Sequence, residues 1–295
     1  MTPGSICSTK SRSSEANGFA RFVRQSHNFL LLADNSIVDR RLCTIKGGTC
    51  TSPLFIVEIF CFGDRVKRAD ANLSTVFLFD VDDTLLNNDR VAEDLKQYLA
   101  NKVSRAGAER YWQIFDQLRT ELGYADYLGA LQRYRLERPR DPKLLAVSHF
   151  MINYPFANRL FPESLDAVEY AKRLGRAVIL SDGDAVFQPL KVERSGLFEI
   201  FEGHVLIYIH KERELDDVEA KYPAAHYVMV DDKVRILAAI KKHWAARVTT
   251  VFPRQGHYAL DAALVAEYPK PDITLERIGE LQEYSLEEIL AAAGK

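Results

Sequence analysis

Short apolar runs that end in polar residues recur along this chain of 295 residues from about position 76 onward. The clearest runs cover residues 76–78, 177–180, 205–209 and 227–230. Each has the length and composition of a buried strand, and between them apolar residues return at the spacing of amphipathic helices. Strands that alternate with helices favour a parallel sheet with helices on both faces. We therefore expect an α/β fold with a doubly wound, Rossmann-like parallel sheet at its core.

The first run leads into the sequence FDVDDTLLN at residues 79–87, the most informative stretch of the chain. Asp80 and Asp82 stand two residues apart at the end of this predicted strand. Carboxylates at such a place are costly unless they have a partner or a function. The simplest explanation is that one of them caps the following helix, as Asp often does. The ends of the other runs argue instead for a shared function.

The other three runs also lead to side chains that carry chemistry. In chain order these residues are Ser181, Asp182, Gly183, Lys211, Asp231 and Asp232. Open α/β sheets bind ligands at the carboxyl ends of their strands, where the order of the strands reverses. We therefore expect the residues that follow all four strands to converge on one crevice.

Asp-x-Asp-x-Thr-Leu after a strand, followed in order by a hydroxyl, a lysine and paired carboxylates, resembles the four motifs of the haloacid dehalogenase-like (HAD) hydrolase superfamily. The resemblance implies that Asp80 is the nucleophile, Asp82 a general acid and base, and Lys211 the third catalytic residue. The residues that it places at the substrate phosphate are Thr84, Ser181, Asp182 and Gly183. The metal ligands that it implies are Asp80, Asp82 (through its backbone carbonyl), Asp231 and Asp232.

The chemistry implied by this resemblance explains why these residue types occur together. A carboxylate such as Asp80 can attack phosphorus and form an aspartyl-phosphate. Because this attack brings negative charges together, a divalent cation and Lys211 must offset them. Mg²⁺ suits such a site because it prefers oxygen ligands and needs only one or two carboxylates. Asp82 would protonate the leaving alkoxide and then activate the water that hydrolyses the intermediate.

The fourth motif departs from the pattern Gly-Asp-x-x-x-Asp that many relatives share. Val230 stands at the position of the glycine, and Arg235 stands at that of the later aspartate. The adjacent pair Asp231 and Asp232 resembles the Asp-Asp variant of the motif instead. Asp232 is therefore expected either to bind the metal or to contact a residue that binds it.

The stretch of about ninety residues between the first two motifs has a helical pattern, at the place where the family inserts a cap domain. Apolar spacing predicts helices over residues 90–103, 109–122, 124–136 and 142–152. We expect an inserted α-helical cap of the first type at residues 89–159, and a catalytic core at residues 74–88 and 160–295. Aromatic and basic cap residues are candidates for contact with the leaving group, although packing is the commoner role of aromatic residues at helical spacing. These residues are Tyr124, Tyr127, Arg133, Tyr134 and Arg135.

Together these observations predict a Mg²⁺-dependent phosphatase, a hydrolase that acts on a small phosphorylated metabolite. A dehalogenase on the same fold needs neither a metal nor an acid at the position of Asp82, which argues against that alternative. A phosphomutase would keep every catalytic residue found here, so the sequence leaves that alternative open. A non-catalytic binding protein on the same fold should have lost catalytic positions, and none of the expected ones is missing.

Composition narrows the choice of partners. The chain has 39 Lys and Arg against 41 Asp and Glu, a formal net charge of −2, which does not indicate a nucleic-acid surface. No apolar run has the length of a membrane span, so no membrane partner is expected. The four cysteines are Cys7, Cys43, Cys50 and Cys61, with neither zinc nor redox spacing. The cysteine-free remainder is compatible with a reducing compartment, and we expect a cytoplasmic protein.

Residues 1–73 differ from the rest of the chain. They carry ten Lys and Arg against six Asp and Glu, and they begin with a polar, Ser-rich stretch. Three explanations fit: a targeting segment, a disordered tail, or translated sequence upstream of the true start. We expect a weakly structured extension without a catalytic role.

Deletion of residues 1–72 is predicted to leave folding and turnover intact, because every motif and the whole expected cap follow residue 73. Thermal melting and turnover of the truncated and full chains test this. A large fall in melting temperature, or an insoluble truncation, would show instead that the apolar pieces at 29–32 and 54–57 pack on the core.

Overall fold

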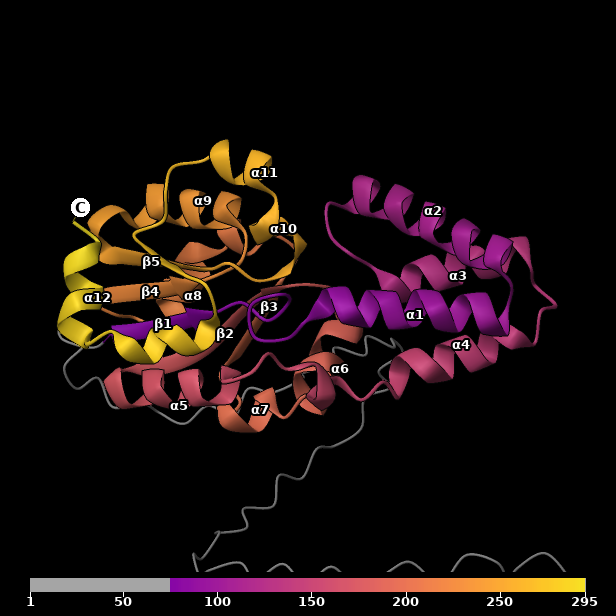
Figure 1. Cartoon of the computed structure of the whole chain (residues 1–295), viewed down its shortest axis with the longest axis horizontal. Coiled ribbons are helices and arrows are strands. Elements are labelled where there is room, and N and C mark those ends of the chain that lie inside the picture. The colour runs from indigo at the N-terminus through magenta and orange to yellow at the C-terminus, as the bar shows by residue number, and fades with distance from the viewer. Residues whose placement is uncertain (1–74, 295) are drawn as a thin grey trace, which may run out of the picture. The chain divides into compact units, whose positions relative to one another are not determined.

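The computed structural model describes residues 75–294, so the extension expected at residues 1–73 lies outside the described residues. At its centre is one sheet of six parallel strands (Figure 1). The strands are β1 (Thr75–Phe79), β2 (Arg176–Asp182), β3 (Val205–Tyr208), β4 (His226–Val230), β5 (Val248–Pro253) and β6 (Ile273–Leu275). Their order across the sheet is β3-β2-β1-β4-β5-β6. The predicted α/β, Rossmann-like fold class is confirmed.

The strand order reverses between β1 and β4. From β1 the sheet grows through β2 to β3, and the chain then returns to add β4, β5 and β6 on the other side of β1. The four predicted apolar runs correspond to β1, β2, β3 and β4, and two of these strands, β1 and β4, flank the reversal. Doubly wound sheets bind ligands at such a switch point, beyond the carboxyl ends of the strands.

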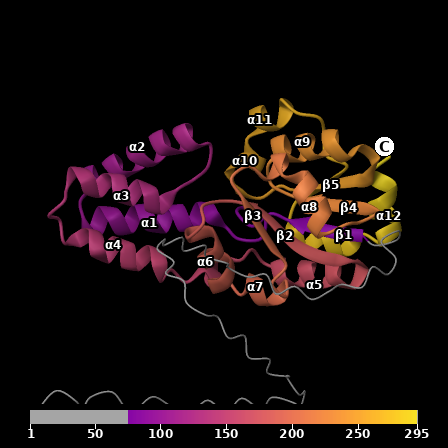
Figure 2. The ribbon, with the colours of Figure 1, turned by 180° about the vertical axis from the view of Figure 1, so that it is seen from behind.

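Successive residues of the central strand are buried on opposite faces of the sheet. Phe77 and Phe79 belong to one apolar cluster, and Val76 and Leu78 belong to a second. The first face is covered by α5 (Ser164–Leu174), α6 (Phe187–Arg194), α7 (Leu197–Ile200) and α12 (Leu286–Ala292), and the second by α8 (Leu215–Lys221) and α9 (Val234–Trp244), as Figures 1 and 2 show. Burial on both faces explains why these strands are continuous apolar runs rather than alternating ones.

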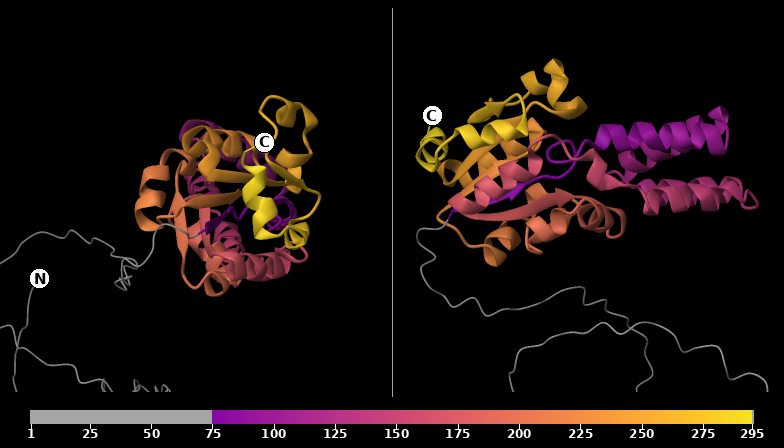
Figure 3. Two further views of the ribbon diagram at one scale, coloured as in Figure 1. Left: turned by 90° about the vertical axis from the view of Figure 1, so that its left-hand side faces the viewer. Right: turned by 60° about the horizontal axis from the view of Figure 1, so that its bottom comes forward.

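The first four helices after β1 form a layer to one side of the sheet (Figures 1 and 3). They are α1 (Asn88–Lys102), α2 (Arg105–Leu122), α3 (Tyr127–Glu137) and α4 (Lys143–Ile152). The expected starts of α2 and α3 were wrong. Ser104 begins α2 four residues early because its side chain accepts a hydrogen bond from the Gly107 N–H over 3.0 Å. Asp126 delays α3 in the same way, by accepting from the Gly129 N–H over 2.6 Å.

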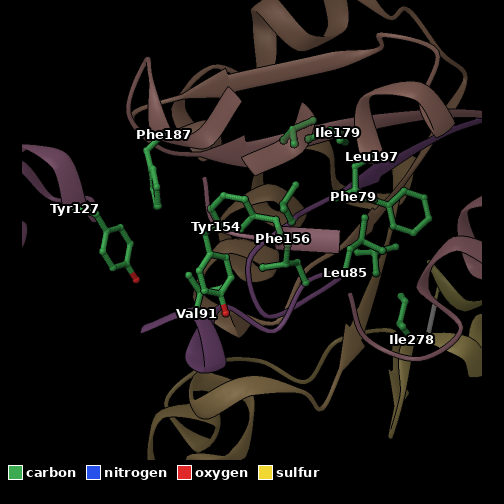
Figure 4. Close-up of a cluster of buried hydrophobic side chains, with 14 of the residues drawn as sticks. Phe79, Leu85, Val91, Tyr127, Tyr154, Phe156, Ile179, Phe187, Leu197 and Ile278 are labelled. Carbon is green, nitrogen blue, oxygen red and sulfur yellow. The ribbon is translucent and has the colours of Figure 1, made fainter. Parts of the chain in front are cut away.

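One apolar cluster runs from the sheet into this helical layer (Figure 4). Phe187 of α6 lies between Tyr127 of α3, with ring centroids 5.4 Å apart, and Phe156, with centroids 5.6 Å apart. Val91 of α1 belongs to the same cluster as Phe79 of β1. This shared packing holds the helical layer beside the carboxyl end of β1.

The remaining elements are short. They are α10 (Gly256–Leu260), α11 (Ala262–Ala266) and the 3-10 turns Phe156–Arg159, Lys211–Arg213, Ala245–Arg247 and Ile278–Glu283. Among residues 75–294, no helix combines the length and the apolar composition needed to cross a membrane.

Gly175, which ends α5 ahead of β2, is predicted to tolerate no side chain. A Cβ at this position would lie 2.3 Å from the carbonyl oxygen of Thr75, at the start of the central strand. Because β1 is hydrogen-bonded to strands on both sides, its backbone cannot yield easily. Gly175→Ala should therefore lower the free energy of unfolding by about 1–3 kcal/mol, measured by urea unfolding.

Gly294→Ala is the matched control, because a Cβ there would meet no atom of the other described residues within 4 Å. This control should stay within about 0.5 kcal/mol of the wild type, as surface substitutions usually do. Equal stability of the two variants would contradict the close approach at Gly175.

Candidate active site

The register of the sheet brings the ends of the central strands to one level. Phe79, the last residue of β1, pairs with Ile179 of β2 and with Val230 of β4. Asp80 therefore follows β1 at the height at which Asp231 follows β4, and the Asp80 N–H donates to the Val230 carbonyl over 2.9 Å. The sequence motifs, although far apart along the chain, thus meet at the switch point of the sheet.

Lys211, after β3, lies between two carboxylates. Its Nζ is 2.5 Å from Asp80 Oδ1 and 2.6 Å from Asp231 Oδ2, and all three side chains are at most 2% exposed. Burial alone would lower the pKa of Lys211, but the carboxylates of Asp231 and Asp80 outweigh it and raise that pKa. Burial would raise the pKa of Asp80, but the charge of Lys211 outweighs it and the pKa is lowered. Asp80 is thus held as a carboxylate, the form in which it can act as a nucleophile.

Two hydroxyls complete the surroundings of the Asp80 carboxylate. Ser181 Oγ donates to Asp80 Oδ1 over 3.3 Å, and Thr84 Oγ1 donates to Asp80 Oδ2 over 3.5 Å. Gln188 Nε2 in turn donates to Ser181 Oγ over 3.0 Å, and the Asp232 N–H donates to Thr84 Oγ1 over 3.0 Å. Ser181 and Thr84, which were expected at the substrate phosphate, here orient the carboxylate of Asp80.

Asp182 and Gly183, the other residues expected at the phosphate, also have partners within the protein. Asp182 Oδ1 accepts from the backbone N–H of Lys211 over 2.7 Å, which fixes the turn that carries this lysine. Burial raises the pKa of Asp182, although the charge of Lys211 opposes the shift. The Gly183 N–H donates to the Tyr208 carbonyl over 2.9 Å. A role of these two residues at a phosphate stays a prediction.

Three carboxylates gather beside Lys211. Oxygens of Asp80, Asp231 and Asp232 lie within 4.8 Å of one another. Both carboxylate oxygens of Asp232 are buried and lack a hydrogen-bond partner among the described residues. Burial raises the pKa of Asp232 well above its ordinary value despite the nearby charge of Lys233, and it raises the pKa of Asp231 to about 6. Buried carboxylate oxygens without hydrogen-bond partners suit a hard divalent cation, so this cluster could hold Mg²⁺.

Asp82 and Asp83 have different partners. The side chain of Asp82 is 21% exposed, and Lys191 Nζ lies 2.6 Å from its Oδ1 and 2.8 Å from its Oδ2. Asp83 Oδ1 accepts the backbone N–H groups of Asn88 and Asp89, over 2.8 and 3.1 Å, at the start of α1. Asp83 therefore supports the start of the helix, the role that the simplest explanation gave to Asp80 or Asp82.

A cavity of about 480 Å³ is lined by residues of both the helical layer and the sheet region. Asp82, Lys191 and Lys233 belong to its lining. Of the five residues considered for contact with the leaving group, Tyr124 and Tyr127 line the cavity, and the other three do not. Tyr134 is fully buried within the helical layer, in agreement with a packing role, and Arg133 pairs with Glu121 over 2.8 Å.

The short helix α10 contacts both the helical layer and the loop of the first motif. His257 Nδ1 lies 2.5 Å from Asp89 Oδ1 of α1, and Arg119 of α2 donates to the Tyr258 hydroxyl. Gly256, at φ +73°, lies so close to Asp83 that an added Cβ would be 2.4 Å from the Cβ of that residue. Burial raises the pKa of Asp83 to about 7. The loop of the first motif and the helical layer are therefore held by the same three residues of α10.

Sequence reasoning missed Gln188, Lys191 and Lys233. Gln188 and Lys191 lie one turn apart on α6 and are 3% and 1% exposed. Burial would lower the pKa of Lys233, but the carboxylates of Asp232 and Asp80 raise it. Only their positions in the sequence could have pointed to these three residues. Lys233 directly follows the Asp-Asp pair, and Gln188 and Lys191 form a Gln-x-x-Lys pattern in the helix after the second motif.

The chain is similar to known proteins of one hydrolase family. The family model for haloacid dehalogenase-like hydrolases matches residues 75–243. A protein from Burkholderia xenovorans assigned to the haloacid dehalogenase-like hydrolases is 59% identical, and the match covers 73% of this chain and 98% of that one with a TM-score of 0.70. A haloacid dehalogenase-like family hydrolase from Xanthomonas campestris is 17% identical over 77% of this chain and 97% of that one, with a TM-score of 0.51.

The L-2-haloacid dehalogenase of Xanthobacter autotrophicus is 16% identical over 72% of this chain and 97% of that one, with a TM-score of 0.50. At such identities the last two likenesses concern the fold alone. No curated protein matches the chain. The match to the family model spans more than half of the chain, and the Burkholderia protein is matched over nearly its whole length. This chain belongs to the haloacid dehalogenase-like hydrolase family.

Proposed function

We propose that this hydrolase is a Mg²⁺-dependent phosphatase that acts on a small phosphomonoester through an aspartyl-phosphate on Asp80. The observation that carries the proposal is the buried carboxylate of Asp232, which lies beside Asp80 and Asp231 and has no hydrogen-bond partner within residues 75–294. Such a cluster calls for a cation, whereas the dehalogenase alternative needs none. Asp82 at the cavity supports the proposal as well, because a dehalogenase needs no acid at that position.

In the first step, the phosphoryl group is transferred to Asp80. A carboxylate oxygen of Asp80 attacks phosphorus, and the bond from phosphorus to the leaving oxygen breaks. Lys211 keeps Asp80 ionised and faces the negative charge of the phosphoryl group, while Asp82 gives a proton to the leaving alkoxide. Asp80, Asp231, Asp232 and the backbone carbonyl of Asp82 would hold the Mg²⁺, which offsets charge on the phosphoryl oxygens.

In the second step, water frees the nucleophile. Asp82, now a carboxylate, takes a proton from a water molecule that attacks the aspartyl-phosphate, so that inorganic phosphate leaves and Asp80 is restored. In a phosphomutase, a hydroxyl of a second substrate would take the place of this water. We propose that residues 89–159 are a cap over a core of residues 74–88 and 160–295. Such a cap excludes other water from the cavity and strengthens the electrostatic interactions inside it.

Asp80→Asn is predicted to abolish turnover while the protein stays folded. The amide is nearly isosteric but cannot attack phosphorus, and loss of a nucleophile typically lowers kcat by several orders of magnitude. The measurement is release of inorganic phosphate from alkyl and aryl phosphates with Mg²⁺ and with chelator, beside release of halide from 2-haloacids. Asp216→Asn is the matched control, because the side chain of Asp216 is 95% exposed.

If Asp80→Asn keeps more than a tenth of the wild-type rate of phosphate release, Asp80 is not the nucleophile. Halide release that persists in chelator, without phosphate release, would support dehalogenase chemistry instead.

Asp232→Asn is predicted to stabilise the protein in chelator and to weaken its response to Mg²⁺. Because burial raises the pKa of Asp232 in the folded state, its contribution to stability is complete below about pH 4 and is lost as pH rises through the raised pKa. Asn carries no charge, so at neutral pH the variant should gain about 1–2 kcal/mol, on the order of the cost of an unsatisfied buried group. Thermal melting in chelator at pH 5 and pH 8 should show a larger gain at pH 8.

With Mg²⁺ added, the wild type should gain more in melting temperature than Asp232→Asn, because a ligand that binds the folded state stabilises it. If the variant melts at a lower temperature than the wild type in chelator, and Mg²⁺ raises its melting temperature as much as that of the wild type, Asp232 is not a metal ligand.

A further inference from the structure

The ammonium of Lys191 is buried and surrounded by oxygen atoms. The residue is 1% exposed, and its Nζ contacts both carboxylate oxygens of Asp82 and, over 3.0 Å, Asn88 Oδ1. Among residues 75–294, Lys191 is the only residue whose side chain hydrogen-bonds to the carboxylate of Asp82. Burial of an ammonium group in an ion pair is a poor means of stabilising a fold, because its desolvation consumes much of the attraction. The geometry of this pair therefore calls for a functional explanation.

Lys191 also connects two parts of the domain. It lies on α6 of the sheet region, whereas Asn88 is the first residue of α1 in the helical layer. Asn88 Nδ2 donates to the Tyr127 hydroxyl of α3 over 3.3 Å, and the ring of Tyr127 packs on Phe187, the first residue of α6. The buried ammonium of Lys191 thus contacts both Asp82 and a residue of the helical layer.

We propose that Lys191 is a positioning residue for the acid–base group Asp82. It holds the Asp82 carboxylate by both oxygens in one orientation at the cavity, and through Asn88 it ties that orientation to the helical layer. The proposal rests on the proposed function, because it assigns to Asp82 the proton transfers of phosphomonoester hydrolysis. In this proposal Lys191 acts on the reaction only through Asp82.

Proton transfer explains why such positioning matters. A general acid must lie within about 2.6–3.2 Å of the atom that it protonates, directly or through one water. Asp82 stands on a loop beyond the end of β1 and is partly exposed, so without a partner its side chain would sample several rotamers. A misplacement of about 1 Å in a catalytic group can lower the rate about 100-fold. The two contacts from Lys191 restrict the Asp82 carboxylate to one orientation.

The test is a double-mutant cycle of Lys191→Met and Asp82→Ala in the full chain with Mg²⁺. Lys191→Met should lower kcat about 10- to 100-fold on an alkyl phosphate with little change in KM, and should lower it less on nitrophenyl phosphate, whose leaving group needs little protonation. In the Asp82→Ala background the same change should cost less than about twofold, because the group that Lys191 positions is already absent. Lys191→Arg, which keeps the charge and the donors, should recover part of the loss.

Lys221→Met is the matched control, because this lysine is half exposed and pairs with Asp217 on the surface. It should leave kcat unchanged on both substrates. Equal losses from Lys191→Met in the two backgrounds, or on the two substrates, would reduce Lys191 to a structural residue and overturn the proposal.

A second variant covers the case in which Lys191→Met does not fold. Asn88→Ala removes one contact of Lys191 and should lower kcat about 3- to 10-fold on the alkyl phosphate, again only when Asp82 is present. No loss, or a loss that is independent of Asp82, would overturn the proposal. If the wild type releases no phosphate from any phosphomonoester, the proposed function fails and this proposal fails with it. If the wild type releases phosphate but the effects of Lys191→Met and Asp82→Ala on kcat are additive, the role of Lys191 is contradicted and the proposed function is not.

Discussion

One ammonium group shared by two buried carboxylates is the interaction on which this site depends. Lys211 joins Asp80, at the end of β1, to Asp231, at the end of β4, on the two sides of the switch point of the sheet. Neither carboxylate could stay ionised at such a depth without a counter-charge. The pairing keeps the pKa of Asp80 low, but both carboxylate oxygens of Asp232 lack a hydrogen-bond partner among the described residues. The cluster of three carboxylates could therefore hold a further cation.

The two aspartates of the first motif have contrasting surroundings, although one residue separates them. Asp80 is buried on Lys211 and held by two hydroxyls, which suits a nucleophile that must keep one position. Asp82 reaches the cavity and rests on Lys191, which suits a group that must meet both a leaving oxygen and a water. Separate environments are a general way to give two carboxylates different roles in one reaction.

Much of the fold and of the site followed from local pattern. The four apolar runs became β1, β2, β3 and β4, and their order placed the reactive residues at one end of the sheet. The errors were also local in origin. Ser104 and Asp126 moved the starts of two helices by side-chain capping. Asp83, which the sequence did not single out, supports the start of α1.

The sequence by itself determined four of the six strands, the order of the motifs and the residue types at the ends of those strands, because periodicity and spacing are properties of the chain. Only the tertiary structure decided which side chains share a charge. Lys191 lies 109 residues from Asp82, and its place in the helix after the second motif does not by itself distinguish it from a solvent-exposed lysine. Its burial depends on how distant segments pack around it, and so does the lack of hydrogen-bond partners for Asp232 in the described part of the chain. The reason is that desolvation depends on all surrounding atoms and not on neighbours in sequence.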